Sequence, residues 1–449
     1  LVTSGPGAPN PVPGLLTAQM DSVPLVLLTG QTITPNLGKD AFQEADVFGV
    51  TMPVVKHSYL VRDVDDLPRI MNEAFYLAIS GRPGPVLVDL PKDVVSAECN
   101  TDFTDELHLP GYNPPARGSA EDIQKAVELI ARSKRPLLYV GAGAIISQAS
   151  RQVIGLAEKL QSPVTTTLLG KGAFPETHPL SVGMLGMHGT AYANKAVTGC
   201  DLIMAIGARW DDRITGKVSE FCPEAIKIHI DIDQAEFGKI IQPDVSIAGD
   251  AKLVLEDLIP LIQKLDTVTW LKQVEQWKRK YPLKFPKRGG LRAQQILHEL
   301  DELTDSNAII ATDVGQHQMW TAQFCKSNDE RKWLSSGGAG TMGYGLPAAI
   351  GAQLGCPDEL VIAVVGDGGF QMTMFELATA ANHKLPIKVL IINNRYLGMV
   401  RQWQQLFFDN RESGVDMVGN PDFVRIGEAY GIKGFHLRRT GDIKRVLKK

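Results

Sequence analysis

The chain has 449 residues and a formal net charge of -4. Its length is sufficient for about three domains of roughly 150 residues each. The lack of excess positive charge excludes the basic surface that is typical of nucleic-acid-binding proteins. No apolar run approaches the roughly 18 residues that a membrane-spanning helix requires, so we expect a soluble protein with no membrane and no nucleic-acid partner.

The cysteines are few and scattered. The chain contains five, and none of them forms a C-x-x-C pair: Cys99, Cys200, Cys222, Cys325 and Cys356. This spacing argues against a zinc site or a disulfide framework and is typical of proteins in a reducing compartment. We therefore expect a cytoplasmic protein, or a plastid protein if the source is a plant or an alga.

Short apolar runs alternate with helical patterns along the whole chain. In chain order the runs are "PLVLLTG", "GPVLVDLP", "RPLLYVGAG", "SPVTTTLLG", "CDLIMAIGA", "AIKIHIDID", "NAIIATDVG", "LVIAVVGDG" and "IKVLIINN". Continuous apolar strands separated by helices are typical of parallel sheets that are covered on both faces. We therefore predict an α/β fold of successive doubly wound parallel-sheet domains, with ligands at the carboxyl ends of the strands.

Two stretches rich in proline, glycine and polar residues are interpreted as linkers. They are residues 99–118, "CNTDFTDELHLPGYNPPARG", and residues 281–290, "YPLKFPKRGG". These linkers divide the chain into three units, residues 1–98, 119–280 and 291–449. Because the chain opens on "LVTSGPG" without an initiator methionine and stops in the amphipathic pattern "GDIKRVLKK", we expect a fragment of a longer chain.

The stretch "VVGDGGFQMTMFELATAANHKLPIKVLIINNRYLGM" joins two of the predicted strands. The first strand runs into a predicted Gly-Asp-Gly turn, a helical pattern follows, and the second strand ends in two asparagines. Asp367 and Asn394 are therefore expected to be neighbours at the carboxyl ends of two parallel strands. Carboxylate, amide and carbonyl oxygens are the ligands that Mg²⁺ prefers, together with phosphate oxygens. Gly366, Gly368 and Gly369 let backbone N–H groups approach such phosphates.

Either half of this stretch alone is more typical of an ordinary turn or strand end. Joined by a helix and a strand, the two halves resemble the thiamine diphosphate signature, Gly-Asp-Gly followed by Asn-Asn. The resemblance implies that Mg²⁺ is held by Asp367, by the side chain of Asn394 and by the carbonyl oxygen of Tyr396. Such a cofactor supplies a ring carbanion that adds to a ketone and stabilises the acyl carbanion left by decarboxylation.

Further segments resemble the catalytic subunit of the acetohydroxyacid synthase (acetolactate synthase) family. They are "AFQEADVFGVTMPVVKHSYLV", "SGRPGPVLVDLPKDV", "MLGMHGTAYANKAV", "IGARWDDRITG", "DVGQHQMW", "SSGGAGTMGYGLPAAIGAQ" and "GMVRQWQ", in the family's order and across all three units. The resemblance implies that pyruvate is decarboxylated and joined to pyruvate or 2-ketobutyrate in branched-chain amino acid biosynthesis. It also implies a homodimer or homotetramer and a separate regulatory subunit.

The same resemblance assigns residues to the reaction. The implied catalytic set is Gln43, Lys92, Met187, Asp212, Arg213, Met342, Met399 and Trp403. Met342 is expected to hold the cofactor in a bent conformation, and Arg213 to bind the carboxylate of the second ketoacid through its planar fork. Trp403 is expected to favour 2-ketobutyrate by contact with its extra methyl group, a difference of roughly 1–3 kcal/mol. Without the resemblance, these residues are more typical of core packing or surface ion pairs.

The implied thiamine diphosphate ligands lie in the third unit. They are Gln316, His317, Gly340, Gly366, Gly368 and Gly369, with the carbonyl of Gly340 accepting a bond from the aminopyrimidine ring.

The segment "YVGAGAII" begins like a dinucleotide-binding loop. Ile146 occupies the third-glycine position and no acidic residue follows at the usual offset, so a nicotinamide site is weakly supported. The resemblance instead implies FAD that takes no part in net redox chemistry. The implied FAD ligands are Arg82, Gly141, Ala142, Gly143, Thr166, Leu185, Gly207, Arg209, Asp231, Asp250, Gln318 and Met319.

Two features depart from the family pattern. The glutamate through which the family activates its cofactor is expected upstream of Leu1. Pro9, Pro11 and Pro13 occupy positions that are usually not proline, and because proline fixes φ and lacks an N–H donor, we expect the next helix to start late or to be distorted.

Two other interpretations stay open at this point. The chain resembles other thiamine diphosphate enzymes as well, such as a pyruvate oxidase, a glyoxylate carboligase or a simple decarboxylase. If the complete chain lacks the activating glutamate, it is an inactive module that binds a cofactor or a partner.

Overall fold

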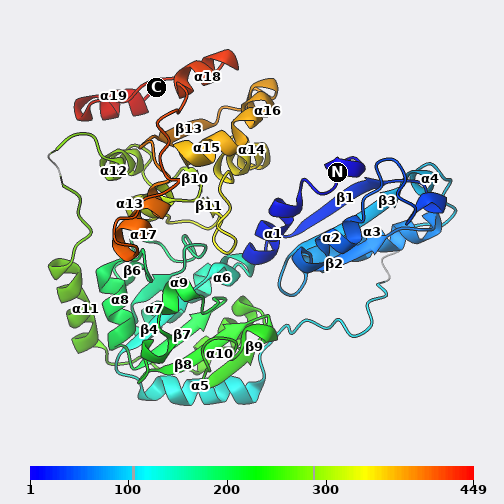
Figure 1. Cartoon of the computed structure of the whole chain (residues 1–449). Helices are drawn as coiled ribbons and strands as arrows, with labels where there is room; N and C mark the ends of the chain where they lie inside the picture. Colours follow the sequence, from blue (N-terminus) through cyan, green and yellow to red (C-terminus); the bar gives the residue numbers. More distant parts are fainter. Residues whose placement is uncertain (104–106, 287–288) are drawn as a thin grey trace. The chain divides into compact units, whose positions relative to one another are not determined.

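The computed structural model describes residues 1–103, 107–286 and 289–449 (Figure 1). Residues 104–106 of the first predicted linker and residues 287–288 of the second lie outside the described residues. The chain forms two compact units. The N-terminal unit comprises Leu1–Pro115 with Gly337–Thr341, and the larger unit comprises Ala116–Ser336 with Met342–Lys449. No helix of the described residues is long and apolar enough to cross a membrane.

The predicted fold class is confirmed, because the named strands form three sheets in which neighbouring strands run parallel. Each sheet falls within one of the three predicted units. The boundaries of those units stay predictions.

The N-terminal unit holds a three-stranded sheet of order β1-β3-β2. Its elements are α1 (Val12–Asp21), β1 (Leu25–Gln31), α2 (Val47–Thr51), β2 (His57–Leu60), α3 (Leu67–Ile79), β3 (Pro85–Pro91) and α4 (Lys92–Val95). Helix α1 begins after Pro11, and Pro13 lies in its first turn. A proline is tolerated there because the first N–H groups of a helix have no partner within the helix.

The larger unit contains a six-stranded sheet of order β6-β5-β4-β7-β8-β9. Its strands are β4 (Pro136–Val140), β5 (Val164–Thr166), β6 (Ser181–Met184), β7 (Leu202–Ile206), β8 (Ile226–Asp231) and β9 (Val245–Ala248). Its helices are α5 (Ala120–Arg132), α6 (Ala142–Ile146), α7 (Ser150–Leu160), α8 (Ala191–Gly199), α9 (Asp212–Thr215), α10 (Ala251–Leu261) and α11 (Val268–Lys280).

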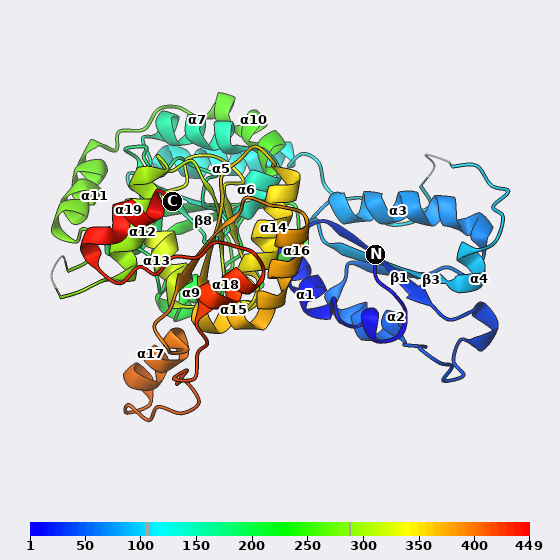
Figure 2. The ribbon, with the colours of Figure 1, turned by 90° about the horizontal axis from the view of Figure 1, so that it is seen from above.

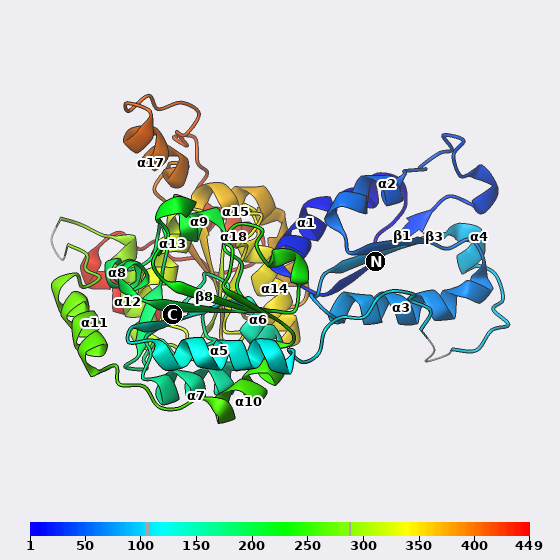
Figure 3. The same ribbon diagram turned by 90° about the horizontal axis from the view of Figure 1, so that it is seen from below.

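Alternate residues of these strands pack against opposite helix layers. Leu138 and Val140 of β4 belong to the core formed with α5, α7 and α10 (Figure 3), whereas Leu137 and Tyr139 belong to the core formed with α8 and α11. Both faces of the sheet are therefore buried, which explains why its central strands β4 and β7 are apolar at every position.

The larger unit also contains a four-stranded sheet of order β11-β10-β12-β13. Its strands are β10 (Ile309–Thr312), β11 (Trp333–Ser335), β12 (Val361–Gly366) and β13 (Lys388–Ile392). Its helices are α12 (Ala293–Leu303), α13 (Gln316–Phe324), α14 (Gly345–Gly355), α15 (Asp367–Thr373), α16 (Leu377–Asn382), α17 (Gly398–Phe407), α18 (Phe423–Ala429) and α19 (Ile443–Leu447).

Both sheets of the larger unit change direction at a defined place. From β10 the chain passes to β11 on one side and then to β12 on the other, and from β4 it passes first to β5 and later to β7. Open α/β sheets bind ligands at such switch points, at the carboxyl ends of the strands. The order of the strands therefore points to the β10/β12 edge and the β4/β7 edge as ligand sites.

Helix α17 projects from the rest of the larger unit. Figure 2 and Figure 3 show α17 and the chain after it standing out from the rest of the larger unit. Its last turn exposes Leu406 and Phe407. The start of this helix, from Gly398 to Val400, lines a pocket of the unit.

Candidate active site

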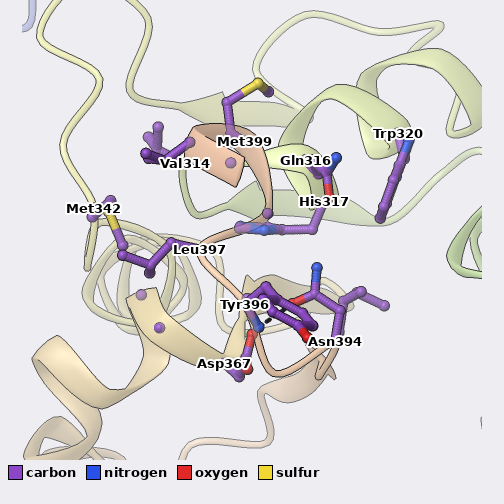
Figure 4. Close-up of a pocket in the computed structure, with 17 residues that line it drawn as sticks. Val314, Gln316, His317, Trp320, Met342, Asp367, Asn394, Tyr396, Leu397 and Met399 are labelled. Atoms are coloured by element: carbon purple, nitrogen blue, oxygen red, sulfur yellow. Dashed lines mark hydrogen bonds between the residues drawn. The ribbon is translucent and has the colours of Figure 1, made fainter. Parts of the chain in front are cut away.

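A pocket lies at the carboxyl ends of β10, β12 and β13, beside the switch point of the four-stranded sheet (Figure 4). It brings together many residues that the sequence predicted for thiamine diphosphate, Mg²⁺ and catalysis. These are Gln316, His317, Met342, Gly366, Asp367, Gly368, Gly369, Asn394, Tyr396 and Met399.

Asp367 is the buried carboxylate of this pocket. The prediction that its strand neighbours the strand before Asn394 is confirmed, because β12 and β13 pair in parallel with Gly366 opposite Ile392. One carboxylate oxygen, Oδ2, accepts hydrogen bonds from the backbone N–H of Arg395 at 3.0 Å and from Nδ2 of Asn420 at 2.6 Å. Burial raises the pKa of Asp367, so a nearby cation would stabilise its charged form.

The predicted turn around Asp367 is wrong in one respect. Helix α15 begins at Asp367 itself, so Gly368 and Gly369 lie in its first turn, and the helical pattern is broken by a 3-10 turn at Met374–Glu376. A Cβ on Gly369 would lie 2.6 Å from the carboxyl carbon of Asp313. Glycine is needed there because the helix start packs directly against a buried carboxylate.

Asn394 and Tyr396 face the pocket together with Asp367 (Figure 4). Between them Arg395 has a φ of 61°, a left-handed conformation that is uncommon outside glycine. The turn is closed by a hydrogen bond from the N–H of Tyr396 to Oδ1 of Asn394 at 3.0 Å. Such strained residues cluster at functional sites, and this one lies in the turn that carries Asn394 and Tyr396.

The start of α13 forms another wall of the pocket, with Gln316 and His317. His317 is 7% exposed, and its Nε2 atom is buried without a hydrogen-bond partner among the described residues. Burial lowers the pKa of His317 to about 4, so the ring is neutral at neutral pH. A buried polar atom without a partner calls for an explanation, of which a bound ligand is one, and a helix N-terminus favours an anion such as a diphosphate.

These observations fit the implied cofactor. Among the described residues there is no cluster of three or more His, Cys, Asp or Glu side chains that could hold a metal. A magnesium ion in this pocket would therefore rely on one carboxylate, one amide oxygen and one carbonyl oxygen, with phosphate oxygens completing its coordination.

The predicted FAD residues of the larger unit lie mostly along the carboxyl edge of the six-stranded sheet. Thr166 ends β5, Leu185 follows β6, and Asp231 ends β8. Gly141, Ala142 and Gly143 follow β4, while Gly207 and Arg209 follow β7. At the switch point the two turns touch, since a Cβ on Gly143 would lie 2.6 Å from the Cα of Gly207.

Some of these residues already have partners within the chain. Asp250 caps α10 by accepting the N–H of Leu253 at 3.1 Å, and Gln318 on α13 donates to the hydroxyl of Ser335 at 2.7 Å. Met319 follows Gln318 on α13 and is half-buried. The hydroxyl of Thr166 is buried and has no partner among the described residues. That orphaned hydroxyl fits a ligand at this edge.

Two of the predicted substrate residues meet within the larger unit. The guanidinium carbon of Arg213 lies 5.3 Å from the ring centroid of Trp403, a distance suited to a cation–π contact. Met187 donates its backbone N–H to the carbonyl of Arg213 at 2.9 Å. Asp212 and Met187 are exposed, and Trp403 does not line the pocket itself.

Four predicted residues lie in the N-terminal unit. Gln43 is exposed with a φ of 59°, and Lys92 is the exposed first residue of α4. Arg82 donates from Nε to the hydroxyl of Ser22 at 2.9 Å. Gly340 belongs to the segment Gly337–Thr341, which is grouped with the N-terminal unit. The roles of these four residues stay predictions.

Three domain models of one enzyme family match the chain, one for each of the three sheets. Residues 1–50 match the thiamine pyrophosphate enzyme N-terminal TPP binding domain, residues 123–258 its central domain and residues 313–449 its C-terminal TPP binding domain. The acetolactate synthase large subunit of Cyanidium caldarium is 50% identical over 457 residues, which cover 99% of this chain and 78% of that relative. The chain belongs to the acetolactate synthase large-subunit family.

Two members of this family with lower sequence identity also match the whole length of the chain. The acetolactate synthase large subunit IlvB1 of Mycobacterium tuberculosis is 46% identical over 459 residues, covering 100% of this chain and 74% of the relative. The acetolactate synthase isozyme 3 large subunit of Escherichia coli is 44% identical over 457 residues, covering 100% of this chain and 80% of the relative.

Three polar residues that support the pocket were missed by the sequence prediction. Asp313 is buried after β10 and accepts N–H bonds from Val314 and Gly343 at 2.6 and 2.9 Å, which joins two walls of the pocket. Its signal, an acidic residue after an apolar strand, was the same one that identified Asp367. Asn420 donates to Asp367, and Gln402 accepts from Gln316 at 2.7 Å. No sequence pattern around either residue predicts its place at the pocket.

Proposed function

We propose that the chain is the catalytic subunit of an acetolactate synthase and binds thiamine diphosphate through Mg²⁺ in the β10/β12/β13 pocket. The observation that carries the proposal is the pocket itself. Buried Asp367, Asn394 and the orphaned Nε2 atom of His317 line one cavity at a topological switch point. Bound thiamine diphosphate would supply the carbanion chemistry by which a 2-ketoacid loses CO₂ and its remainder is joined to a second 2-ketoacid.

The chain's own residues would hold and orient the cofactor. Asp367, Asn394 and the carbonyl of Tyr396 are the proposed metal ligands, while Gln316 and His317 bind the diphosphate. His317 would donate Nε2–H to a phosphate oxygen, a bond that the neutral ring makes only in the tautomer with its proton on Nε2.

Met342 is proposed to pack against the cofactor from the side of the pocket shared with Leu397 (Figure 4). Gln43, Lys92 and the carbonyl of Gly340, which belong to the N-terminal unit, are proposed to contribute to the same reaction.

The acceptor ketoacid is proposed to bind near Arg213 and Trp403. The contact between their side chains supports this assignment, because it holds a carboxylate-binding fork next to an apolar surface. Pyruvate and 2-ketobutyrate differ by one methylene group, which such a surface can distinguish by roughly 1–3 kcal/mol. Met187, Asp212 and Met399 would line the same region.

FAD is proposed to lie along the carboxyl edge of the six-stranded sheet, and Arg82 is proposed as a further FAD ligand. The orphaned hydroxyl of Thr166 and the close approach of Gly143 to Gly207 support a ligand at this edge.

The proposed assembly is a homodimer or homotetramer with a separate regulatory subunit, which the name "large subunit" of the relatives suggests. The five cysteines are free, which suits a reducing compartment such as the cytoplasm or a plastid.

The test is a product assay. The full-length protein is supplied with pyruvate, thiamine diphosphate, Mg²⁺ and FAD, and acetolactate is measured. With 2-ketobutyrate added, acetohydroxybutyrate is expected as well. Formation of acetaldehyde or acetyl phosphate, or of no product, would refute the proposal and favour one of the other thiamine diphosphate enzymes or an inactive module.

A further inference from the structure

A buried ion pair reaches from the six-stranded sheet to helix α13. Lys171 follows β5 and is 1% exposed. Its Nζ atom lies 2.5 Å from Oε2 of Glu176 and donates to the carbonyl of Ala322, on α13, at 3.0 Å. The same ammonium lies 5.2 Å from the ring centroid of Trp333 on β11. One side chain therefore joins elements that belong to two different sheets.

The acidic partner of this pair is equally engaged. The same Oε2 atom of Glu176 accepts the backbone N–H of Ser327 at 2.7 Å. Next to it, Thr177 donates from its N–H and its hydroxyl to Oδ1 of Asn328 at 3.2 and 3.0 Å. Residues after β5 are thus fastened to the segment between α13 and β11.

The backbones also approach one another closely at this place. Gly172 has a φ of 90°, and a Cβ on it would overlap the carbonyl oxygen of Asp329. No larger residue fits there, so the position of Lys171 relative to α13 is set by main-chain packing as well as by charge.

Stability alone does not explain a buried ion pair of this kind. Burying two charges carries a desolvation cost that often equals or exceeds their attraction, and well-packed apolar residues frequently stabilise a fold as much. The geometry that the pair imposes is its more distinctive effect, because both partners have several fixed hydrogen bonds.

Helix α13 connects the Lys171–Glu176 ion pair to the pocket. Ala322 lies in the last turn of the helix, where the carbonyl groups carry partial negative charge that a cation stabilises. Gln316 and His317 lie in the first turn and line the pocket. The helix has 9 residues, so it is about 14 Å long, and a tilt of about 5° at one end would move the other end by about 1 Å. Displacements of that size in a binding site are costly.

We propose that Lys171 is a positioning residue for thiamine diphosphate: paired with Glu176, it holds the C-terminal end of α13 and thereby keeps Gln316 and His317 at the diphosphate end of the pocket. The inference rests on the proposed function of that pocket. It assigns to the segment after β5 an indirect part in binding the thiamine cofactor, through α13.

The decisive variant is the double substitution Lys171→Met with Glu176→Leu. It removes both charges and leaves neither one buried and unpaired, so a purely structural role predicts that stability and cofactor affinity both stay near the wild-type values. A positioning role predicts a melting temperature near that of the wild type and a Kd for thiamine diphosphate raised about tenfold. Isothermal titration with thiamine diphosphate and Mg²⁺ on the full-length protein gives the Kd.

Two further variants complete the experiment. Lys217→Met removes one partner of an exposed pair with Glu220 in the same unit, and it is expected to leave the Kd unchanged. If the double variant does not fold, Glu176→Gln, which keeps the side-chain length and an acceptor for Ser327, is expected to raise the Kd as well. If the double variant folds and its Kd for thiamine diphosphate equals that of the wild type, the inference is overturned. If the double variant does not fold, the same result for Glu176→Gln overturns it.

The titration contains no ketoacid, so this outcome is separate from that of the product assay. A wild-type protein that binds the cofactor but makes no acetolactate would refute the proposed reaction. The positioning role of Lys171 could still be tested in that case. A wild-type protein that binds no thiamine diphosphate would overturn both.

Discussion

Gly398 is a position at which a single methyl group would perturb the packing of the pocket. It is the first residue of α17, and a Cβ on it would overlap the amide oxygen of Gln316 and lie 2.7 Å from Nδ2 of Asn394. The amide of Gln316 is itself held by a hydrogen bond to Oε1 of Gln402 at 2.7 Å. Gly398→Ala is therefore expected to displace a proposed diphosphate ligand and a proposed metal ligand together.

The size of the effect follows from these contacts. A lost hydrogen bond costs about 1 kcal/mol, and overpacking a fixed site costs about 1–3 kcal/mol. Because the overlapping atom is the end of a flexible side chain, the lower part of that range applies. A total of about 2 kcal/mol corresponds to a Kd for thiamine diphosphate that is raised about 30-fold.

Gly351→Ala in α14 is the matched control. Nothing lies within 4 Å of a Cβ at Gly351, so the same substitution there adds helix propensity without a clash. It is expected to stabilise the fold by roughly 0.5–1 kcal/mol and to leave cofactor binding unchanged. Isothermal titration and thermal unfolding of both variants make the comparison. Equal affinities for thiamine diphosphate in the two variants would refute the reasoning.

Two further predictions concern acceptor choice and pH. Trp403→Leu should lower the preference for 2-ketobutyrate over pyruvate by about tenfold, measured as the ratio of acetohydroxybutyrate to acetolactate in a competition assay; an unchanged ratio would favour another thiamine diphosphate enzyme. Burial lowers the pKa of His229 to about 4 from its usual 6.5, so the stability of the fold should be complete above pH 6.5 and should fall as the pH is lowered towards 4. At pH 5 this group lowers the free energy of unfolding by about 2 kcal/mol. His229→Gln should therefore show a smaller drop in melting temperature between pH 7 and pH 5 than the wild type. Equal drops in the two proteins would contradict the assignment.

The acid sensitivity assigned to His229 has a structural reason. Its Nδ1 atom accepts from the indole N–H of Trp210 at 3.3 Å, and its Nε2–H donates to the carbonyl of Ala208 at 3.0 Å. A second ring proton would point at the indole N–H donor. The neutral ring is thus the form that the fold accepts.

The parts of the fold that local patterns control could be predicted from the sequence. Apolar strands alternating with helices predicted parallel sheets, and the same geometry correctly predicted that the strand before Asp367 is the neighbour of the strand before Asn394. Each of these predictions depends on residues close in the sequence and on a regular property of parallel sheets.

The contacts that support the site could not be predicted in this way. Asn420 lies 53 residues from its partner Asp367, and Lys171 lies 151 residues from Ala322. In "LLGKGAFPETHP" nothing marks the lysine as buried, because its environment is created by a helix of another sheet. The start of α15 at Asp367 was also missed, since glycines are poor helix formers and tertiary packing against Asp313 decides the conformation there.

Binding of thiamine diphosphate with and without Mg²⁺ tests the central claim most directly. We expect isothermal titration of the full-length protein to show binding that requires Mg²⁺ and is abolished by a chelator. Asp367→Asn should weaken binding by about 100-fold, whereas Asp358→Asn, at an exposed residue of the same unit, should not change it. Binding of equal strength with and without the chelator, or in Asp367→Asn and the wild type, would contradict the assignment of this pocket.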